Sequence, residues 1–304
     1  MTDLPAIDRA RPEWLRRRER GSAWSIRLSV RLALVLGRPM ARLFVPLGAL
    51  YFLVFSLEGR RASRDYLGRA LGRPPGLLEV FRHFQAFGAC VLDRTYFLRR
   101  RTDLFDVRIV GEELLIELLK EKTGCLLLGA HIGSFEVLRA MGRAHPDLKV
   151  NMLMFEENAQ KIGSVLGGIA PDLVREIISL GRPDAFIRTL RVLEQGHFVG
   201  LLADRSLTSD HQVRLPFLGS PAPFSLGAFR MMVLLRKPVL LMVGLYRGGN
   251  RYDIHIERFA VPEDLPRRAG PSELAVLAGR YAERLEHHCR AAPYNWFNFY
   301  KFWD

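Results

Sequence analysis

The sequence predicts an α/β fold, in which a mostly parallel central sheet is flanked by helices on both faces and preceded by an N-terminal helical segment. From residue 105 onward, short apolar runs alternate with helix-like segments of about a dozen residues, the pattern of strands joined by crossover helices. Most of these runs are apolar throughout, as expected for strands covered on both faces. The chain before residue 102 is strongly basic and carries one long apolar run. We therefore divide the chain into residues 1–101 and residues 102–304.

Short apolar runs predict the strands, and apolar residues at helical spacing predict the helices. The expected strands are residues 105–110, 125–129, 150–155, 176–180, 198–203, 239–246 and 252–259. The expected helices are residues 111–121, 135–144, 157–168, 184–195, 225–236 and 271–291. The last strand alternates apolar and polar residues from Arg251 to Phe259, which predicts an edge position in the sheet.

The composition excludes several classes of protein. With 304 residues, of which 49% are hydrophobic and 25% charged, the chain can bury a sizeable core and is not a disordered, solvated tail. The three cysteines form no CxxC pair, which argues against a disulfide scaffold and against a zinc module. They fit a protein of the reducing cytosol.

The basic region contains a candidate membrane anchor. Residues 1–101 hold 20 Arg, no Lys and 8 acidic residues, and so account for nearly all of the net charge of +13. Among them lies a 15-residue apolar run from Leu43 to Leu57. This run is short for a transmembrane helix, which needs about 20 apolar residues, and it begins too far into the chain for a secretory signal. Flanking arginines each contribute about 1 kcal/mol near an anionic membrane surface. We expect a retained anchor that lies in one leaflet.

Two other interpretations of the basic region stay open. A buried core helix also fits an apolar run of this length. Nucleic acid selects arginine clusters as well. Here, however, the arginines flank an apolar run and do not form a polar stripe with exposed aromatic residues, so no nucleic acid is expected as a partner.

Candidate catalytic residues follow two of the expected strands, where ligands bind in an open parallel sheet. His131 follows the strand at residues 125–129, and its imidazole suits proton abstraction near pH 7, which predicts a general base. Glu136, in the first turn of the next helix, is expected to accept from the other ring nitrogen and to stabilise the imidazolium. Asp204 and Arg205 follow another of the strands.

Gly133 and Ser134 lie between His131 and Glu136. Glycine suits a turn at this point and serine suits the N-cap of the following helix. Exposed N–H groups here would favour an oxyanion. The alternatives are a structural role for His131 and, for Glu136, a solvated acid that complements the helix dipole.

Other catalytic signatures are missing from the sequence. It contains no GxSxG nucleophile elbow, no GxxxxGK[ST] phosphate loop, no GxGxxG fingerprint and no HExxH. His287, His288 and Cys289 are adjacent on an expected helix and diverge around it, so we expect them on the surface and predict no metal site. Cys125 lies inside an apolar strand, where a thiolate is disfavoured, so a cysteine nucleophile is not expected.

The segment GAHIGSFE at residues 129–136 resembles the H-x4-D/E motif of the glycerolipid and lysophospholipid acyltransferase superfamily, in particular the bacterial lipid A biosynthesis acyltransferases. Three further segments are similar to elements of that family: LADR at residues 202–205, VRLPFLGSPA at residues 213–222, which resembles a loop before a helix, and PYNW at residues 293–296. The ending WFNFYKFW and the segment Arg60 to Ser63 resemble most a sub-branch of predicted acyltransferases of polyene-pigment and other unusual lipid pathways.

The resemblance implies transfer of a fatty acyl group from a thioester of acyl carrier protein or coenzyme A to a hydroxyl of a lipid-like acceptor. It implies no cofactor beyond that co-substrate, and a location on the cytoplasmic face of the bacterial inner membrane. His131 would deprotonate the hydroxyl while Glu136 holds the imidazole. The alternative that fits the same basic surface is a non-catalytic lipid-binding or carrier-docking membrane protein.

Four residues are assigned to substrate binding on the strength of the resemblance: Gly133, Ser134, Asp204 and Arg205. Donors near Gly133 or Arg205 would stabilise the tetrahedral oxyanion. Arg205 would otherwise grip a phosphate of the donor or of the acceptor, or form a salt bridge with Asp204.

The end of the chain is unusually aromatic, with seven aromatic residues between Pro293 and Trp303. Either these residues pack on the core or wall an acyl channel, or they lie at the membrane interface.

Overall fold

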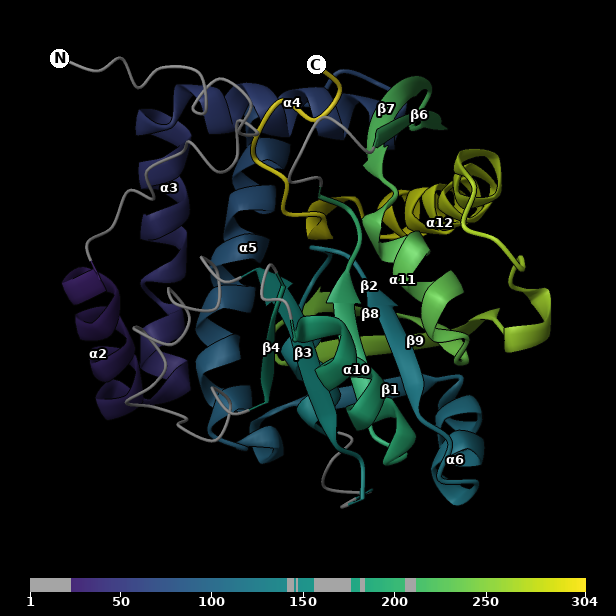
Figure 1. The fold of residues 1–304 in the computed structure, drawn as a ribbon. Coiled ribbons are helices and arrows are strands. Elements are labelled where there is room, and N and C mark those ends of the chain that lie inside the picture. The colour runs from purple at the N-terminus through teal and green to yellow at the C-terminus, as the bar shows by residue number, and fades with distance from the viewer. Residues whose placement is uncertain (1–22, 141–144, 146, 156–175, 181–183, 206–211) are drawn as a thin grey trace, which may run out of the picture.

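A computed structural model describes residues 23–140, 145, 147–155, 176–180, 184–205 and 212–304. They contain a seven-stranded sheet with the order β1-β9-β8-β2-β5-β3-β4, in which every pair is parallel except β8 and β9 (Figure 1). The strands are β1 (Asp106–Val110), β2 (Cys125–Gly129), β3 (Val150–Phe155), β4 (Ile177–Leu180), β5 (Phe198–Leu202), β8 (Val239–Gly248) and β9 (Arg251–Ala260). The prediction of a mostly parallel sheet is confirmed.

Helices cover both faces of this sheet. The longer ones are α2 (Ala23–Arg42), α3 (Val45–Phe55), α4 (Leu57–Leu71), α5 (Leu77–Leu98), α6 (Glu112–Lys120), α10 (Ala185–Glu194), α11 (Gly227–Leu235) and α12 (Pro271–Ala291). Alternate residues of β2 point to opposite faces. Leu126 and Leu128 belong to one buried cluster with α11 and α12, whereas Cys125 and Leu127 belong to a second cluster with α5 and α6. Each fully buried leucine contributes about 1.5–3 kcal/mol, which explains why this strand is apolar throughout.

Most of the expected helices are present at or near their predicted bounds, but the segment after His131 differs. It begins as the 3-10 helix η2 (Phe135–Ala140), and the rest of the helix expected there lies largely outside the described residues. The helix expected at residues 157–168 lies wholly outside them. Within the described residues, further 3-10 turns join the elements, namely η1 (Thr102–Leu104), η4 (Pro262–Asp264) and η5 (Pro293–Asn295).

A hairpin replaces the loop expected at residues 213–222. It consists of β6 (Gln212–Phe217) and β7 (Ser220–Ser225), paired antiparallel. Leu218 and Gly219 connect the strands with φ angles of 50° and 83°, the two positive values that a type I′ turn requires. Glycine adopts such angles without strain, whereas leucine does so only because the paired strands impose it.

The edge position expected for β9 is wrong, because β9 lies between β1 and β8. One of its polar residues faces a helix. Glu257 of β9 accepts two hydrogen bonds from Arg284, at 2.7 and 2.8 Å, and lies 2.8 Å from Nε2 of His288, both of α12. His288 and Cys289 are therefore buried, which corrects the surface position expected for them, whereas His287 is exposed.

The helices α2 and α3 expose a wide apolar surface. In Figure 1 they stand beside α5, at the far left of the molecule. Of the residues of α3 only Ala49 is buried, so the alternative of a buried core helix is wrong. We call the exposed side chains the apolar helix surface; they are Leu32, Val35, Leu36, Met40, Leu43, Phe44, Leu47, Leu50, Tyr51, Phe52, Val54 and Phe55. Within the described part of the chain no helix alone is long and apolar enough to cross a membrane. Val30–Arg42 and Val45–Phe55 satisfy that test as a pair, but they are bent by 85°.

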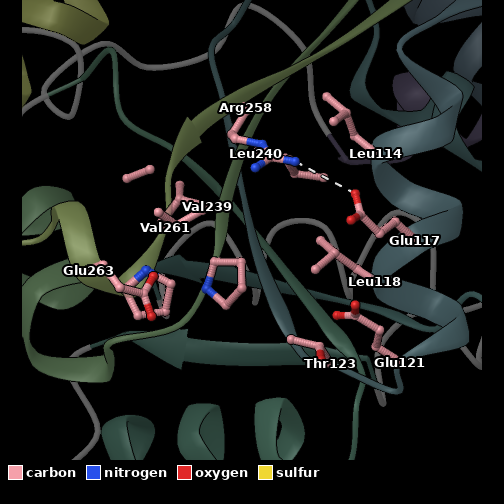
Figure 2. Close-up of a pocket in the computed structure, with 13 residues that line it drawn as sticks. Leu114, Glu117, Leu118, Glu121, Thr123, Val239, Leu240, Arg258, Val261 and Glu263 are labelled. Atoms are coloured by element: carbon pink, nitrogen blue, oxygen red, sulfur yellow. Dashed lines mark ion pairs between the residues drawn. The ribbon is translucent and has the colours of Figure 1, made fainter.

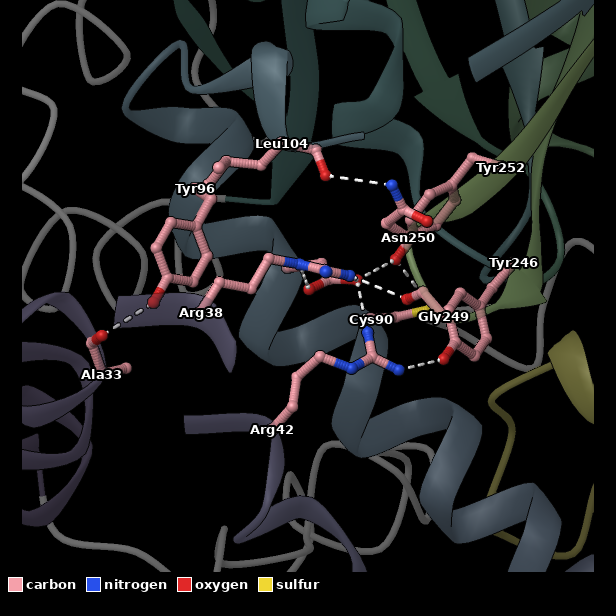
Figure 3. A network of polar contacts seen from close by, with 11 residues as sticks. Ala33, Arg38, Arg42, Cys90, Tyr96, Leu104, Tyr246, Gly249, Asn250 and Tyr252 are labelled. Carbon is pink, nitrogen blue, oxygen red and sulfur yellow. Dashed lines mark hydrogen bonds and ion pairs between the residues drawn. The ribbon is translucent and has the colours of Figure 1, made fainter. Parts of the chain in front are cut away.

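A buried ionic network fastens α2 to the rest of the molecule (Figure 3). Arg38 forms two hydrogen bonds to Asp93 of α5, at 2.8 and 2.9 Å, and one to the carbonyl of Gly249 at 2.8 Å. Arg42 lies 3.3 Å from the same carboxylate, which also accepts from the hydroxyl of Tyr252 at 2.9 Å. Because Asp93 is fully buried, these donors, and not water, stabilise its negative charge.

Replacement of Asp93 by Ala leaves two arginines in this network without their carboxylate. We expect a loss of about 3–5 kcal/mol in the free energy of unfolding, the usual cost of removing one partner of a buried ion pair. Urea unfolding followed by circular dichroism measures it. The matched control is Asp65→Ala, which removes an exposed pair with Arg69 on α4 and should change stability little. Equal stability of the two variants would show that the buried pair does not hold α2.

Candidate active site

His131 and Asp204 meet at the carboxyl ends of two neighbouring strands. Strands β2 and β5 pair in parallel with Gly129 opposite Leu202, and each polar residue follows two positions later. His131 Nδ1 lies 2.8 Å from Asp204 Oδ1, and the backbone N–H of His131 donates to Asp204 Oδ2 at 3.0 Å. One carboxylate therefore holds both the ring and the backbone of the histidine.

The Asp204 carboxylate is only 2% exposed, and further donors surround it. Oδ2 also accepts from the indole N–H of Trp296 at 2.9 Å and from the side-chain amide of Asn298 at 3.2 Å. Burial by itself would raise the pKa of Asp204, but the neighbouring His131 ring and Arg205 outweigh burial and hold that pKa well below its usual value. Asp204 is therefore ionised. Its contacts with the ring and the backbone of His131 are those of a group that orients the histidine, and the substrate-binding role expected for Asp204 stays a prediction.

His131 is in the protonation state that a general base needs. Because the carboxylate at Nδ1 only accepts, Nδ1 carries the proton and Nε2 keeps a free lone pair. Burial, followed by the positive charge of Arg205, lowers the pKa of His131 below its ordinary value, against the opposing effect of Asp204. The ring is thus neutral near pH 7. Its side chain is 31% exposed, so the histidine is not enclosed in the core.

The loop after His131 is clamped between β8 and the end of the chain. The N–H of Gly133 donates to the carbonyl of Asn295 at 2.7 Å, and the N–H of Ser134 donates to the carbonyl of Gly244 at 2.8 Å. Gly133 has a φ of 59°, and a Cβ there would lie 1.9 Å from the Gly244 oxygen, so only glycine fits. Both N–H groups are occupied within the protein. They are therefore not the exposed donors that we expected from the sequence, and the assignment of Gly133 and Ser134 to substrate binding stays a prediction.

Ser134 does not act as the expected N-cap. Its hydroxyl is buried and has no hydrogen-bond partner among the described residues. A serine that capped η2 would donate or accept through this oxygen.

Glu136 contacts an arginine rather than the imidazole nitrogen occupied by Asp204. Its carboxylate lies 2.7 Å from the guanidinium of Arg94, which comes from α5. The charge of Arg94, like that of Arg205, contributes to the lowered pKa of His131, so both guanidinium groups lie near the ring. The predicted contact of Glu136 with the imidazole is therefore not made at Nδ1, and no signal in the sequence pointed to Arg94.

Arg205 is held against the C-terminal segment. Its Nε donates to the side-chain oxygen of Asn298 at 2.8 Å, and a terminal nitrogen donates to the carbonyl of Phe297 at 3.1 Å. The guanidinium also lies over the ring of Tyr300, at 5.9 Å from its centroid. The C-terminal segment thus fixes the charge that stands next to His131.

The C-terminal aromatic residues pack on the core, which is one of the alternatives that the sequence left open. Trp296, Phe297 and Phe302 are buried, and the other four pack partly buried against the same clusters. The backbone runs antiparallel to the loop after β2, with Trp296 opposite Ile132. The PYNW segment was singled out by resemblance alone, and the structure gives its tryptophan a contact with the carboxylate beside His131.

A cavity of about 180 Å³ lies at the opposite end of the sheet (Figure 2). It is lined by Thr123, before β2, and by Val239, the first residue of β8, with an ion pair of 3.6 Å between Arg258 and Glu117 at its rim. The cavity therefore does not belong to the His131 site.

The described residues contain neither a metal-binding cluster nor an exposed thiol. Among the described residues, no three His, Cys, Asp or Glu side chains are placed to hold a metal ion. The three cysteines are buried and free, and burial raises the pKa of each thiol. A buried thiol of raised pKa is a poor nucleophile, in agreement with the sequence.

The family model of the bacterial lipid A biosynthesis acyltransferases matches residues 85–304, which include both strands that carry the site and the C-terminal segment that holds Asp204. No curated protein matches the chain. Because the matched segment is more than half of the chain, the protein belongs to the bacterial lipid A biosynthesis acyltransferase family.

Proposed function

We propose that this protein transfers a fatty acyl group from a thioester of acyl carrier protein or coenzyme A to a hydroxyl of a lipid-like acceptor. The family supports an acyltransferase that acts on a lipid acceptor. The observation that carries the mechanism is the neutral, half-buried His131 paired with the ionised, buried Asp204. The sub-branch of unusual lipid pathways stays a prediction from the sequence.

His131 acts as the general base in this reaction. Nε2 takes the proton of the acceptor hydroxyl, and the resulting alkoxide attacks the thioester carbonyl to form a tetrahedral oxyanion. Collapse of that intermediate breaks the carbon–sulfur bond, and the leaving thiolate takes the proton back from Nε2. Asp204 keeps Nε2 directed at the hydroxyl and stabilises the imidazolium while it exists.

The oxyanion forms close to two guanidinium groups in this mechanism, those of Arg94 and Arg205. Fixed positive charge near developing negative charge lowers the barrier without reorganisation. Arg205 is fixed by Asn298 and Phe297, and Arg94 is fixed by Glu136. We therefore assign Glu136 to the placement of Arg94.

The apolar helix surface lies on an anionic membrane, according to this proposal, at the cytoplasmic face of the bacterial inner membrane. Apolar side chains of α2 and α3 enter the interface, and neighbouring arginines meet lipid phosphates. This arrangement brings a lipid acceptor to a protein whose thioester donors are cytoplasmic. Three free cysteines fit the same compartment.

Replacement of His131 by Ala removes the base, so kcat should fall by about 10²- to 10⁴-fold. Transfer of radiolabelled lauroyl groups from the acyl carrier protein thioester, or from the coenzyme A thioester, into bacterial membrane lipids measures the rate. An unchanged rate would refute the role of His131. If neither wild type nor variant transfers acyl groups while both bind membranes, the non-catalytic lipid-binding alternative is correct.

The pH dependence of kcat/KM also tests the assignment of His131 as the general base. Since the base must be unprotonated, kcat/KM rises with pH through the pKa of His131 and levels off above it. Burial and Arg205 lower this pKa, so the rise lies below the ordinary histidine value of about 6.5. Arg205→Gln should move the rise to higher pH, and Asp204→Asn should move it to lower pH.

A double-mutant cycle tests the role of Glu136. If Glu136 acts through Arg94, the variants Glu136→Gln and Arg94→Gln each lower kcat, and the double variant is no worse than the poorer single one. Losses that multiply in the double variant would instead favour a direct action of Glu136 on the imidazole.

Membrane binding depends in this proposal on the exposed side chains of α3. Leu47→Asp and Phe55→Asp should each weaken binding to vesicles of phosphatidylethanolamine and phosphatidylglycerol by about tenfold, because an apolar side chain leaves the interface. Co-sedimentation measures the bound fraction. The controls Leu234→Asp and Val276→Asp change equally exposed apolar residues of α11 and α12 and should bind like wild type. Equal losses in all four variants would contradict the assignment.

A further inference from the structure

We infer that Trp296 is a positioning residue for acyl transfer, and that His83, buried in α5, holds Trp296 in place. The inference rests on the proposed function of His131 and assigns roles to two residues that the mechanism does not otherwise use. It is carried by a continuous series of hydrogen bonds that runs from α4, through α5 and the C-terminal segment, to the imidazole.

The side chain of Trp296 fixes the direction of the Asp204 carboxylate. Its single N–H donates to Oδ2 at 2.9 Å, and an indole has no other polar group. The ring is fully buried and is packed edge-on by Tyr66, Phe217 and Phe302, with centroids 5.0, 5.3 and 4.8 Å away. Because these contacts fix the orientation of the indole, its N–H holds Oδ2 of Asp204 in one position. The other carboxylate oxygen, Oδ1, then faces Nδ1 of His131.

The backbone of Trp296 is held by His83. The Trp296 carbonyl lies 2.9 Å from Nε2 of His83, and since a carbonyl only accepts, the ring must donate from Nε2. Its Nδ1, now an acceptor, lies 2.9 Å from the hydroxyl of Ser63, which donates to it. His83 and Ser63 have no exposed surface. Burial lowers the pKa of His83 to about 4, so the ring keeps this single neutral tautomer near pH 7.

Ser63 and His83 both precede residue 85, where the match to the family begins. They belong to α4 and α5, the helices against which α3 packs, with Phe52 of α3 6.1 Å from Phe84 of α5 between ring centroids. The N-terminal helices therefore do more than expose an apolar surface. They supply the groups that set the geometry of a site formed by the following domain.

Two tryptophan variants test the role of Trp296. Trp296→Phe removes the N–H that reaches Asp204, whereas Trp303→Phe removes an indole N–H of the same segment that donates to the carbonyl of Phe217 at 3.2 Å. For Trp296→Phe we expect kcat to fall by about 10- to 100-fold, the usual effect of a misplaced catalytic group, with KM for lauroyl-acyl carrier protein unchanged. Trp303→Phe should keep both constants.

The titration of His131, followed by NMR of protein labelled in the histidine rings, provides a readout that needs no activity. A carboxylate that loses a hydrogen-bond donor becomes more basic and favours the imidazolium, so Trp296→Phe should move the titration to higher pH. Trp303→Phe should not move it. If both variants titrate and turn over alike, the inference is overturned. If wild type itself transfers no acyl group, the proposed function fails, while the NMR comparison still decides the placement of Asp204.

Two variants of His83 test whether His83 holds Trp296 in place. They also test the inference if Trp296→Phe does not fold. His83→Gln keeps an N–H that can reach the Trp296 carbonyl, and His83→Leu does not. We expect His83→Leu to lower kcat and to shift the His131 titration to higher pH, as Trp296→Phe does. We expect His83→Gln to keep kcat and the His131 titration close to their wild-type values. Identical behaviour of the two variants would overturn the role of His83.

Discussion

The site depends on the burial of one negative charge. Asp204 lies at the carboxyl end of a central strand, where an ionised carboxylate without partners would cost several kcal/mol. Its four donors come from the loop after β2 and from the C-terminal segment. The requirement to satisfy this carboxylate therefore explains why two distant parts of the chain converge on it. The loop that supplies two of the donors also passes so close to β8 that only a glycine fits at residue 133.

The sequence located the histidine but chose the wrong carboxylate for Nδ1. Continuous apolar runs identified β2 and β5, and the rule that ligands bind at strand ends selected His131 and Asp204 separately. What the sequence does not contain is the strand order. Only the pairing of β2 with β5 brings these residues together across 73 positions, whereas Glu136 is close along the chain whatever the fold. Local proximity was therefore misleading, and the contact of Glu136 with Arg94 depends on how α5 packs on η2.

The other differences between sequence and structure have local physical causes. Pro216, Pro221 and Pro223 reduce the strand signal of β6 and β7, although proline is tolerated in a two-stranded hairpin whose edges are free. The alternation in β9 is real, but polar side chains on it have protein partners: Glu257 contacts Arg284 and His288 of α12, and Asp253 pairs with Arg247 of β8. An alternating sequence predicts that one face of a strand is polar, but it does not predict whether water or other side chains contact that face. Likewise, composition could not show that His83 and Trp296 meet, because their contact joins residues 213 positions apart.

The structure also changes how the N-terminal charge should be understood. Arg38 and Arg42 are directed inward to Asp93, and Arg69 and Arg73 are paired with Asp65 and Glu79. The buried contacts of Arg38 and Arg42 with Asp93 stabilise the protein, and all four arginines leave less free positive charge on the surface than a simple count implies. A free arginine contributes about 1 kcal/mol near an anionic membrane, and an apolar side chain that leaves water contributes about 1.5–3 kcal/mol, so the proposed membrane binding would depend mainly on the apolar residues of α2 and α3. In the proposed membrane-bound state, Asp93 links α2 to α5 and His83 links α5 to Trp296, so the depth of the apolar helix surface in the bilayer is coupled to the height of His131 above it.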